Sequence, residues 1–318
     1  QLTYEQRCQI EVLKRSGFSQ EAIGQAVGTS QSAISRELSR NQGERGYRHR
    51  QAHIRATQRR KAAVTATKMK PGLLAVINVK LGQNWSPEQI SGWLLEDRDQ
   101  GISHESIYRY VWADKKGGGA LHTCLRRRGR RYQWRGSNGK TSRGQIKNRV
   151  SIDERPTAVD AKRQVGHWEI DTVIGKGHSG VLVTIVERVT KFTVACRALS
   201  KSAAHVTTAT LALLAPFKAA VRSITADNGK EFAHHEQIAK SLKCDVYFAH
   251  PYCSWERGLN ENTNGLLRQD FPKSTDFKQV TDSEVKAVVN RLNDRPRKLL
   301  AFKTPAYLMR AHMAALAA

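Results

Sequence analysis

The sequence predicts a multidomain protein in which an all-α N-terminal region with helix-turn-helix units precedes an α/β domain. The chain of 318 residues is long enough for two or three domains of about 100–200 residues each. Its hydrophobic content of 39% is sufficient for packed cores. Apolar residues recur at helical spacing before Val165, and short β-rich segments begin there. This change in periodicity marks the transition between the two parts.

The chain is strongly basic, with 53 Lys and Arg against 28 Asp and Glu and a formal net charge of +25. Residues 1–150 hold 29 of the basic and 11 of the acidic residues, so most of the excess lies in the helical region. Such a charge predicts a polyanionic partner, and double-stranded DNA is the first candidate. No run approaches 18 apolar residues, which argues against a membrane span. The five scattered cysteines are typical of a reducing cytoplasm.

Residues 1–44 are predicted to form a first helix-turn-helix domain. Ser19 can cap a short helix that ends at Gly28, and Ser30 can cap the next one. The N-terminal part of the second helix meets base edges in such a motif. The candidate DNA contacts in this unit are Gln31, Ser32, Ser35 and Arg36. Residues 45–84 are expected to be a basic helical connector.

A second helix-turn-helix is predicted over residues 85–116, with caps at Ser86 and Ser103. Its candidate DNA contacts are His104, Ser106 and Arg109. Either unit could instead serve packing or dimer contacts, but the charge favours DNA, and the first unit is preferred for sequence-specific contact. Residues 117–160 are expected to be an arginine-rich linker that orders on DNA. Its expected phosphate contacts are Arg126, Arg127, Arg128, Arg130 and Arg131.

The α/β domain is predicted over residues 161–275, followed by a helical tail at 276–318. Its expected strands are 165–174, 181–186, 192–198, 223–226 and 244–249. Its expected helices are 202–216, 231–242 and 256–269. This order predicts a mixed sheet in which an antiparallel hairpin is followed by parallel strands joined through helical crossovers.

Three acidic residues of this domain are candidates for chemistry. Asp171 lies within a strand, Asp227 directly follows one, and Glu261 lies on the last helix. Side chains in these places can converge and hold two divalent ions, which suits displacement at phosphorus. These acids also have non-catalytic interpretations. Asp227 could simply form a turn, and Glu261 could be a solvent-exposed acid on the surface of a helix. Glu169 and Glu256 compete as alternative ligands.

Four segments of the chain carry a family resemblance. They are GHWEIDTVIG at 166–175, TADNGKEF at 225–232, PYCSWERGLNENTNGLLRQDFPK at 251–273 and LNDRPRKLLAFKTPAYL at 292–308. These segments resemble the catalytic core of DDE transposases and retroviral-type integrases, which share an RNase H-like fold. The match is closest to bacterial transposases of the insertion-sequence-thirty family, and it extends over essentially the whole chain.

The resemblance implies that Asp171, Asp227 and Glu261 are the catalytic acids and hold two Mg²⁺ or Mn²⁺ ions, with Glu261 preferred to Glu256. It implies that water cuts the DNA at the element's end and that the freed 3′-hydroxyl then attacks target DNA. Two ends must meet, so at least a dimer on DNA is expected, in a cytoplasmic protein associated with the bacterial nucleoid. The further candidate DNA contacts near the site are Lys230, Asn264 and Arg268, although Lys230 is equally readable as a surface lysine.

Two other functions remain open at this point. A helix-turn-helix transcriptional regulator with a non-catalytic α/β domain would share the N-terminal half. A recombinase with a covalent Ser or Tyr nucleophile would need arginines clustered beside it, which Tyr247 and Tyr252 lack. Trp255 is expected to pack against the start of the last helix. The irregular spacing of His234, His235, Cys244, His250 and Cys253 favours ordinary packing over structural zinc.

Overall fold

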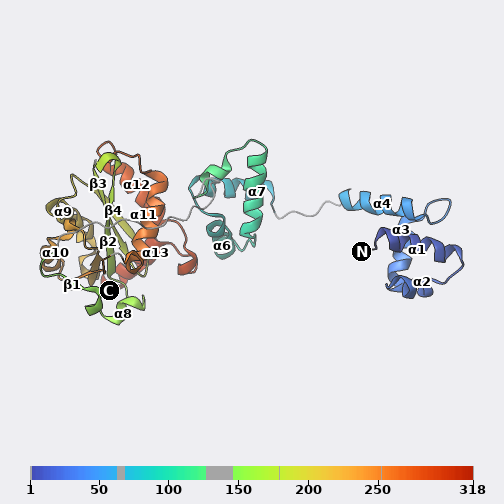
Figure 1. The fold of residues 1–318 in the computed structure, drawn as a ribbon, viewed down its shortest axis with the longest axis horizontal. Helices are drawn as coiled ribbons and strands as arrows, with labels where there is room; N and C mark the ends of the chain where they lie inside the picture. The colour runs from blue at the N-terminus through green and yellow to red at the C-terminus, as the bar shows by residue number, and fades with distance from the viewer. Residues whose placement is uncertain (1, 63–68, 127–145, 179, 252, 318) are drawn as a thin grey trace. The chain divides into compact units, whose positions relative to one another are not determined.

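The computed structural model describes residues 2–62, 69–126, 146–178, 180–251 and 253–317. The chain divides into two compact units, a first unit from Gln1 to Lys68 and a second unit from Met69 to Ala318. Figure 1 shows the helices of the first unit and the mixed sheet of the second. No helix among the described residues is both long and apolar enough to cross a membrane.

The helices described in the first unit are α1 (Tyr4–Arg15), α2 (Gln20–Val27), α3 (Gln31–Asn41) and α4 (His49–Ala62). Ser19 and Ser30 cap α2 and α3, because each side chain accepts a backbone N–H of the first helical turn. Gly28 ends α2 with a φ of 72°, a left-handed conformation that glycine adopts without steric cost. α2, the turn and α3 form the predicted helix-turn-helix.

A buried ion pair joins α1 to α3 in this unit. Arg7 Nε lies 2.7 Å from Glu37 Oε1, and the Tyr47 hydroxyl donates to the same oxygen across 3.0 Å. Ile10 and Ile34 are fully buried beside it. The pair therefore fixes how α3 is presented, since each buried charge is satisfied only in this arrangement.

The second unit begins with α5 (Pro71–Gly82), α6 (Pro87–Arg98), α7 (His104–Lys116) and the 3-10 helix η1 (Leu121–Cys124). Ser86 and Ser103 cap α6 and α7 as expected. The shared core of these helices is built from Ile77, Leu81, Ile90, Leu94, Ile107 and Val111. The expected connector at 45–84 thus contains α4, which packs on α1 and α3, and α5, which belongs to the core beneath α6 and α7.

The sheet of the second unit has six strands within the described residues, in the order β1-β6-β5-β2-β3-β4. Their bounds are Val150–Ser151, His167–Ile174, Val181–Glu187, Thr193–Ala198, Ser223–Ala226 and Asp245–Phe248 for β1 to β6. β2, β3 and β4 form the antiparallel part, whereas β5, β6 and β1 run parallel to β2. The predicted mixed α/β fold is confirmed, and β1 lies inside the segment expected to be a linker.

Helices cover both faces of the sheet (Figure 1). One face packs on α9 (Ala203–Leu214) and α10 (His235–Leu242), and the other on α11 (Gly258–Asp270) and α12 (Asp282–Asn293). The remaining elements are η2 (Ile152–Glu154), α8 (Thr157–Asp160), η3 (Lys176–His178), η4 (Ala215–Ala220), η5 (Lys230–Phe232), η6 (Ser254–Arg257), η7 (Lys298–Leu300) and α13 (Pro305–Ala317). In sheets covered on both sides, ligands bind outside the carboxyl ends of the strands.

Candidate active site

Two acidic side chains of β2, Glu169 and Asp171, point toward the face of the sheet that α11 covers. Trp168 and Ile170 enter the core under α9 and α10, whereas Val173 enters the core under α11 and α12. Successive side chains of a strand point to opposite faces, so Glu169 and Asp171 share the face of Val173. Burial raises the pKa of the Asp171 carboxyl, and the charge of Asp227 raises it further against the opposing effect of Arg257. A carboxylate in this place requires a nearby positive group.

Asp227 lies beside Asp171 because β2 and β5 are parallel neighbours. Glu169 pairs with Thr225 in the sheet register, and Asp171 and Asp227 each follow two residues later. Asp227 Oδ1 accepts the backbone N–H of Gly229 across 2.8 Å, so the side chain also forms the turn that its sequence suggests. Oδ2 remains directed at a cation. The turn-former and active-site interpretations of Asp227 are therefore compatible.

The cation between the two aspartates is Arg257. Its Nη1 lies 3.8 Å from Asp171 Oδ1, and its Nη2 lies 3.2 Å from Asp227 Oδ2. Nη1 also donates to the carbonyl of Ile170 across 3.1 Å. Arg257 was not nominated from the sequence, although it occurs in the same motif as Glu261, four residues earlier. An arginine within an acid-bearing motif was the signal that could have identified it.

Asn264 lies on the face of α11 that is turned toward Asp171. Asn264 Nδ2 donates to Asp171 Oδ2 across 2.8 Å, and its Oδ1 accepts the Thr184 hydroxyl across 3.0 Å. Asn264 was predicted to meet a DNA phosphate, and the structure places it on the expected face but bonded to the aspartate. Glu261 lies three residues earlier on the same face and is exposed.

The structure brings Asp171 and Asp227 together but does not bring Glu261 into their group. Among the described residues, no three His, Cys, Asp or Glu side chains lie close enough together to hold one metal ion. The competitor Glu256 is bonded elsewhere: its carboxylate accepts the backbone N–H of His250 and contacts the ring Nδ1, both across 2.8 Å.

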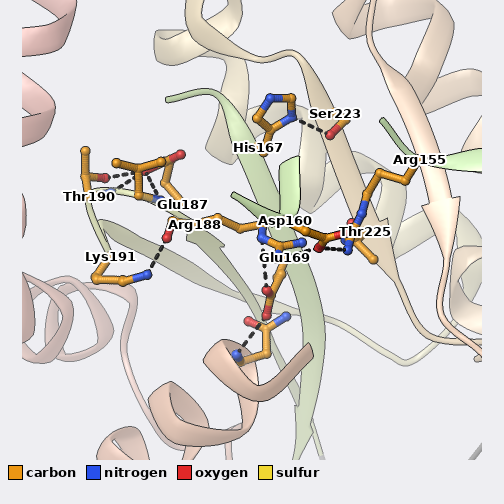
Figure 2. A network of polar contacts seen from close by, with 12 residues as sticks. Arg155, Asp160, His167, Glu169, Glu187, Arg188, Thr190, Lys191, Ser223 and Thr225 are labelled. Carbon is orange, nitrogen blue, oxygen red and sulfur yellow. Dashed lines mark hydrogen bonds and ion pairs between the residues drawn. The ribbon is translucent and has the colours of Figure 1, made fainter. Parts of the chain in front are cut away.

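Glu169 anchors the start of α11 instead of competing for a metal. Its side chain is buried, and Oε2 accepts the backbone N–H of Asn260 across 3.2 Å. Oε1 lies 3.6 Å from Arg188 Nε. Figure 2 shows this network continuing through Asp160, which contacts both Arg188 and Arg155. Burial raises the pKa of Glu169. The network therefore holds the helix that carries Glu261 against β2.

Two further residues predicted to contact DNA, Lys230 and Arg268, differ in whether their side chains are already bonded within the protein. Lys230 is exposed in η5, where it is free to approach DNA. Arg268 donates from Nη2 to the carbonyl of Ile174 across 2.8 Å and from Nη1 to that of Pro272 across 3.3 Å. It thus joins α11 to the end of β2. The expectation that Trp255 packs against the helix start is wrong, since it is 72% exposed; Tyr252 lies outside the described residues.

The candidate DNA contacts of the helix-turn-helix units occupy solvent-facing positions. In α3, Gln31, Ser32 and Arg36 are exposed and Ser35 is half-buried. In α7, His104 and Arg109 are exposed and Ser106 is half-buried. Within the expected linker, Arg126 donates to Asn262 of α11 across 3.2 Å. Arg127, Arg128, Arg130 and Arg131 lie outside the described residues.

Comparison with known proteins agrees with this architecture. The integrase core domain family matches residues 161–254, and a helix-turn-helix domain family matches residues 1–41. The transposase for insertion sequence element IS4351 of Bacteroides fragilis is 44% identical over 96% of this chain and 94% of its own length. The transposase InsI for insertion sequence element IS30A of Escherichia coli is 38% identical over 96% of this chain and 82% of its own length.

Fold and site together define a nucleic-acid-processing enzyme with an integrase-type core and a DNA-binding helix-turn-helix domain. The chain belongs to the insertion-sequence transposases of the insertion-sequence-thirty family. The resemblance drawn from the sequence motifs is confirmed. A transcriptional regulator with a non-catalytic α/β domain is not supported, because the relatives that match over nearly the whole chain are transposases and residues 161–254 match the integrase core domain family.

Proposed function

We propose that this protein hydrolyses a phosphodiester bond at each end of an insertion sequence and joins the freed 3′-hydroxyls to target DNA. In this proposal Asp171, Asp227 and Glu261 are the catalytic acids. The observation that carries it is the convergence of Asp171, in the middle of β2, and Asp227, directly after the parallel neighbour β5, on one positive group. Ligands of open α/β sheets bind near the carboxyl ends of strands, which is where Asp227 lies.

The two aspartates fit divalent ions although Glu261 lies outside their group in this structure, because Mg²⁺ is usually held by one or two carboxylates together with water and phosphate oxygens. Carboxylate oxygens are the preferred ligands of Mg²⁺ and Mn²⁺, and the two aspartates already face a cation of the chain itself. Glu261 would add a third carboxylate from the helix face that Asn264 directs toward Asp171. When bound, two divalent ions supply activation of the attacking oxygen and stabilisation of the leaving one. The chain's own contribution is to hold the acids on two strands and one helix.

In this proposal the helical regions bind the DNA. α3 reads bases of the terminal repeat through Gln31, Ser32, Ser35 and Arg36, and α7 binds nearby duplex through His104, Ser106 and Arg109. Both helices are the second helix of their unit and present these residues to solvent. The arginines at 126–131 and Lys230 would neutralise phosphates. Because two ends must meet, we propose a dimer or larger assembly on DNA.

A cleavage and strand-transfer assay on labelled element ends tests the proposal. We expect activity with Mg²⁺, loss with chelator, and loss by at least about a hundredfold in Asp171→Asn, Asp227→Asn and Glu261→Gln. Glu256→Gln is the matched control, since this acid is bonded to His250 and should retain cleavage. Loss in Glu256→Gln but not in Glu261→Gln would reassign the third acid. Activity in chelator, or a trapped covalent protein–DNA adduct, would refute the metal mechanism.

A further inference from the structure

The guanidinium of Arg257 lies where a positive ion would serve both aspartates. It contacts Asp171 Oδ1 within β2 and Asp227 Oδ2 directly after β5. Its side chain is 10% exposed and those of Asp171 and Asp227 are 24% and 26% exposed, so these ion pairs are partly shielded from water. Nε is buried and has no hydrogen-bond partner among the described residues. The bonds of this arginine are thus concentrated on the two acids and on the carbonyl of Ile170.

The two carboxylates need this charge in the metal-free protein. Two ionised acids that face the same cation from neighbouring segments repel each other, and partial burial strengthens the repulsion. The guanidinium offsets it from a position between them. Asn264 and the backbone N–H of Thr172 each satisfy one oxygen of Asp171 but carry no charge. Arg257 is therefore the group that balances the charge of the pair.

A divalent ion bound to these oxygens would repel the guanidinium in its present position. Mg²⁺ binds carboxylate oxygens at about 2.0–2.1 Å and would stand within a few ångströms of the arginine, where like charges repel strongly. Asp171 is held within β2, and Asp227 is held in the turn after β5 by the backbone N–H of Gly229. Arg257, by contrast, ends the short 3-10 turn η6 immediately before α11. Of the three groups, the arginine is therefore the one expected to move when a metal ion binds.

We propose that Arg257 is an exchangeable counter-ion: it neutralises Asp171 and Asp227 in the absence of metal, and it is displaced by metal toward a DNA phosphate. The inference rests on the proposed metal site and adds a regulation to it. A displaced guanidinium beside the site finds a bidentate partner in a phosphate. DNA should then favour the displaced state, so metal and DNA binding become cooperative, each tightening the other by the same factor.

The test measures Mn²⁺ binding by electron paramagnetic resonance on the full chain, with and without a duplex of the element end. Arg257→Met keeps the length of the side chain and removes the charge. Without DNA, we expect Arg257→Met to bind Mn²⁺ at least about tenfold more tightly than the wild type, because the competing charge is gone. With DNA, the wild type should tighten by a similar factor, and Arg257→Met should change much less.

Arg197→Met is the matched control, because Arg197 of β4 also pairs with an aspartate, its Nε lying 2.8 Å from Asp282 Oδ1, but outside the proposed site. It should leave Mn²⁺ affinity unchanged. Equal or weaker Mn²⁺ binding by Arg257→Met, with a folded protein by circular dichroism, overturns the counter-ion role. The metal site is tested separately by Asp227→Asn: wild-type Mn²⁺ affinity in this variant overturns the proposed site, whereas lost affinity supports it whatever Arg257→Met shows. Absence of Mn²⁺ binding in all variants overturns both.

Discussion

Asn264 donates a hydrogen bond to the carboxylate of Asp171 across 2.8 Å, although 93 residues separate them. The amide also accepts from Thr184 of β3, so one side chain connects α11 to both β2 and β3. Its orientation is thereby determined: the Nδ2 must face the acid and the Oδ1 the hydroxyl. Asn264 positions the first aspartate relative to the helix that carries Glu261.

Replacing Asn264 should therefore affect geometry more than folding. We expect Asn264→Ala to lower the free energy of unfolding by about 1.5–3 kcal/mol, the usual effect of a lost hydrogen bond to a charged group. Strand-transfer activity should fall more steeply than this loss implies. Urea unfolding in chelator and the cleavage assay measure the two effects. Asn290→Ala, at an exposed position of α12, is the control; equal activity of both variants would contradict the positioning role.

Asp171 should make the metal-free protein less stable as pH rises. Burial raises its folded pKa above the ordinary 3.8, so the folded state retains the proton longer than the unfolded chain does. Stability therefore falls as pH increases from about 3.8 through the higher folded pKa. Asp171→Asn removes this fall and should be more stable than the wild type at pH 7 in chelator. Urea midpoints across this pH range measure it, and a parallel pH profile in both proteins would exclude the effect.

His250 reports where Glu256 is engaged. Hydrogen bonds to Glu256 and Asp153 raise its pKa above 6.5. The pairing therefore contributes fully to the stability of the folded protein below pH 6.5, and this contribution is lost as pH rises through the folded pKa. We expect Glu256→Gln to shift the titration of the His250 ring to lower pH, followed by NMR. Glu261→Gln should leave this titration in place. A shift caused by Glu261→Gln instead would mean that Glu256 and Glu261 have been assigned to the wrong roles.

The contact residues of α3 should confer sequence preference. Arg36 is exposed on this helix, with Nε donating to the carbonyl of Ser32. We expect Arg36→Ala to weaken binding to the terminal repeat by about 10- to 100-fold and to bind a scrambled duplex nearly as well as before. Fluorescence anisotropy at fixed salt measures both. Arg15→Ala, which removes an exposed arginine of α1, should weaken both duplexes slightly and equally; matching profiles for the two variants would argue against readout by α3.

Local sequence patterns predicted much of the fold because they indicate the periodicity of helices and strands and the capping and turn residues at which these elements begin and end. The serine caps and Gly28 located α2 and α3, and the strands at 167–174, 181–187 and 193–198 lie close to their expected bounds. β1 went unrecognised, since two residues carry no detectable alternation. The division of residues 45–84 between α4 and α5 depends on which core each helix joins, which local pattern does not express.

The sequence by itself determined the fold class, the basic helix-turn-helix region and the nomination of the acids, because residue type and spacing along the chain carry that information. Only the tertiary structure decided that Arg257 lies between the aspartates, that Asn264 binds Asp171 and that Glu169 anchors α11. These contacts join residues about 30 to 93 positions apart in the chain. They depend on strand order and on which sheet face a helix covers, and both are settled by packing of the whole domain.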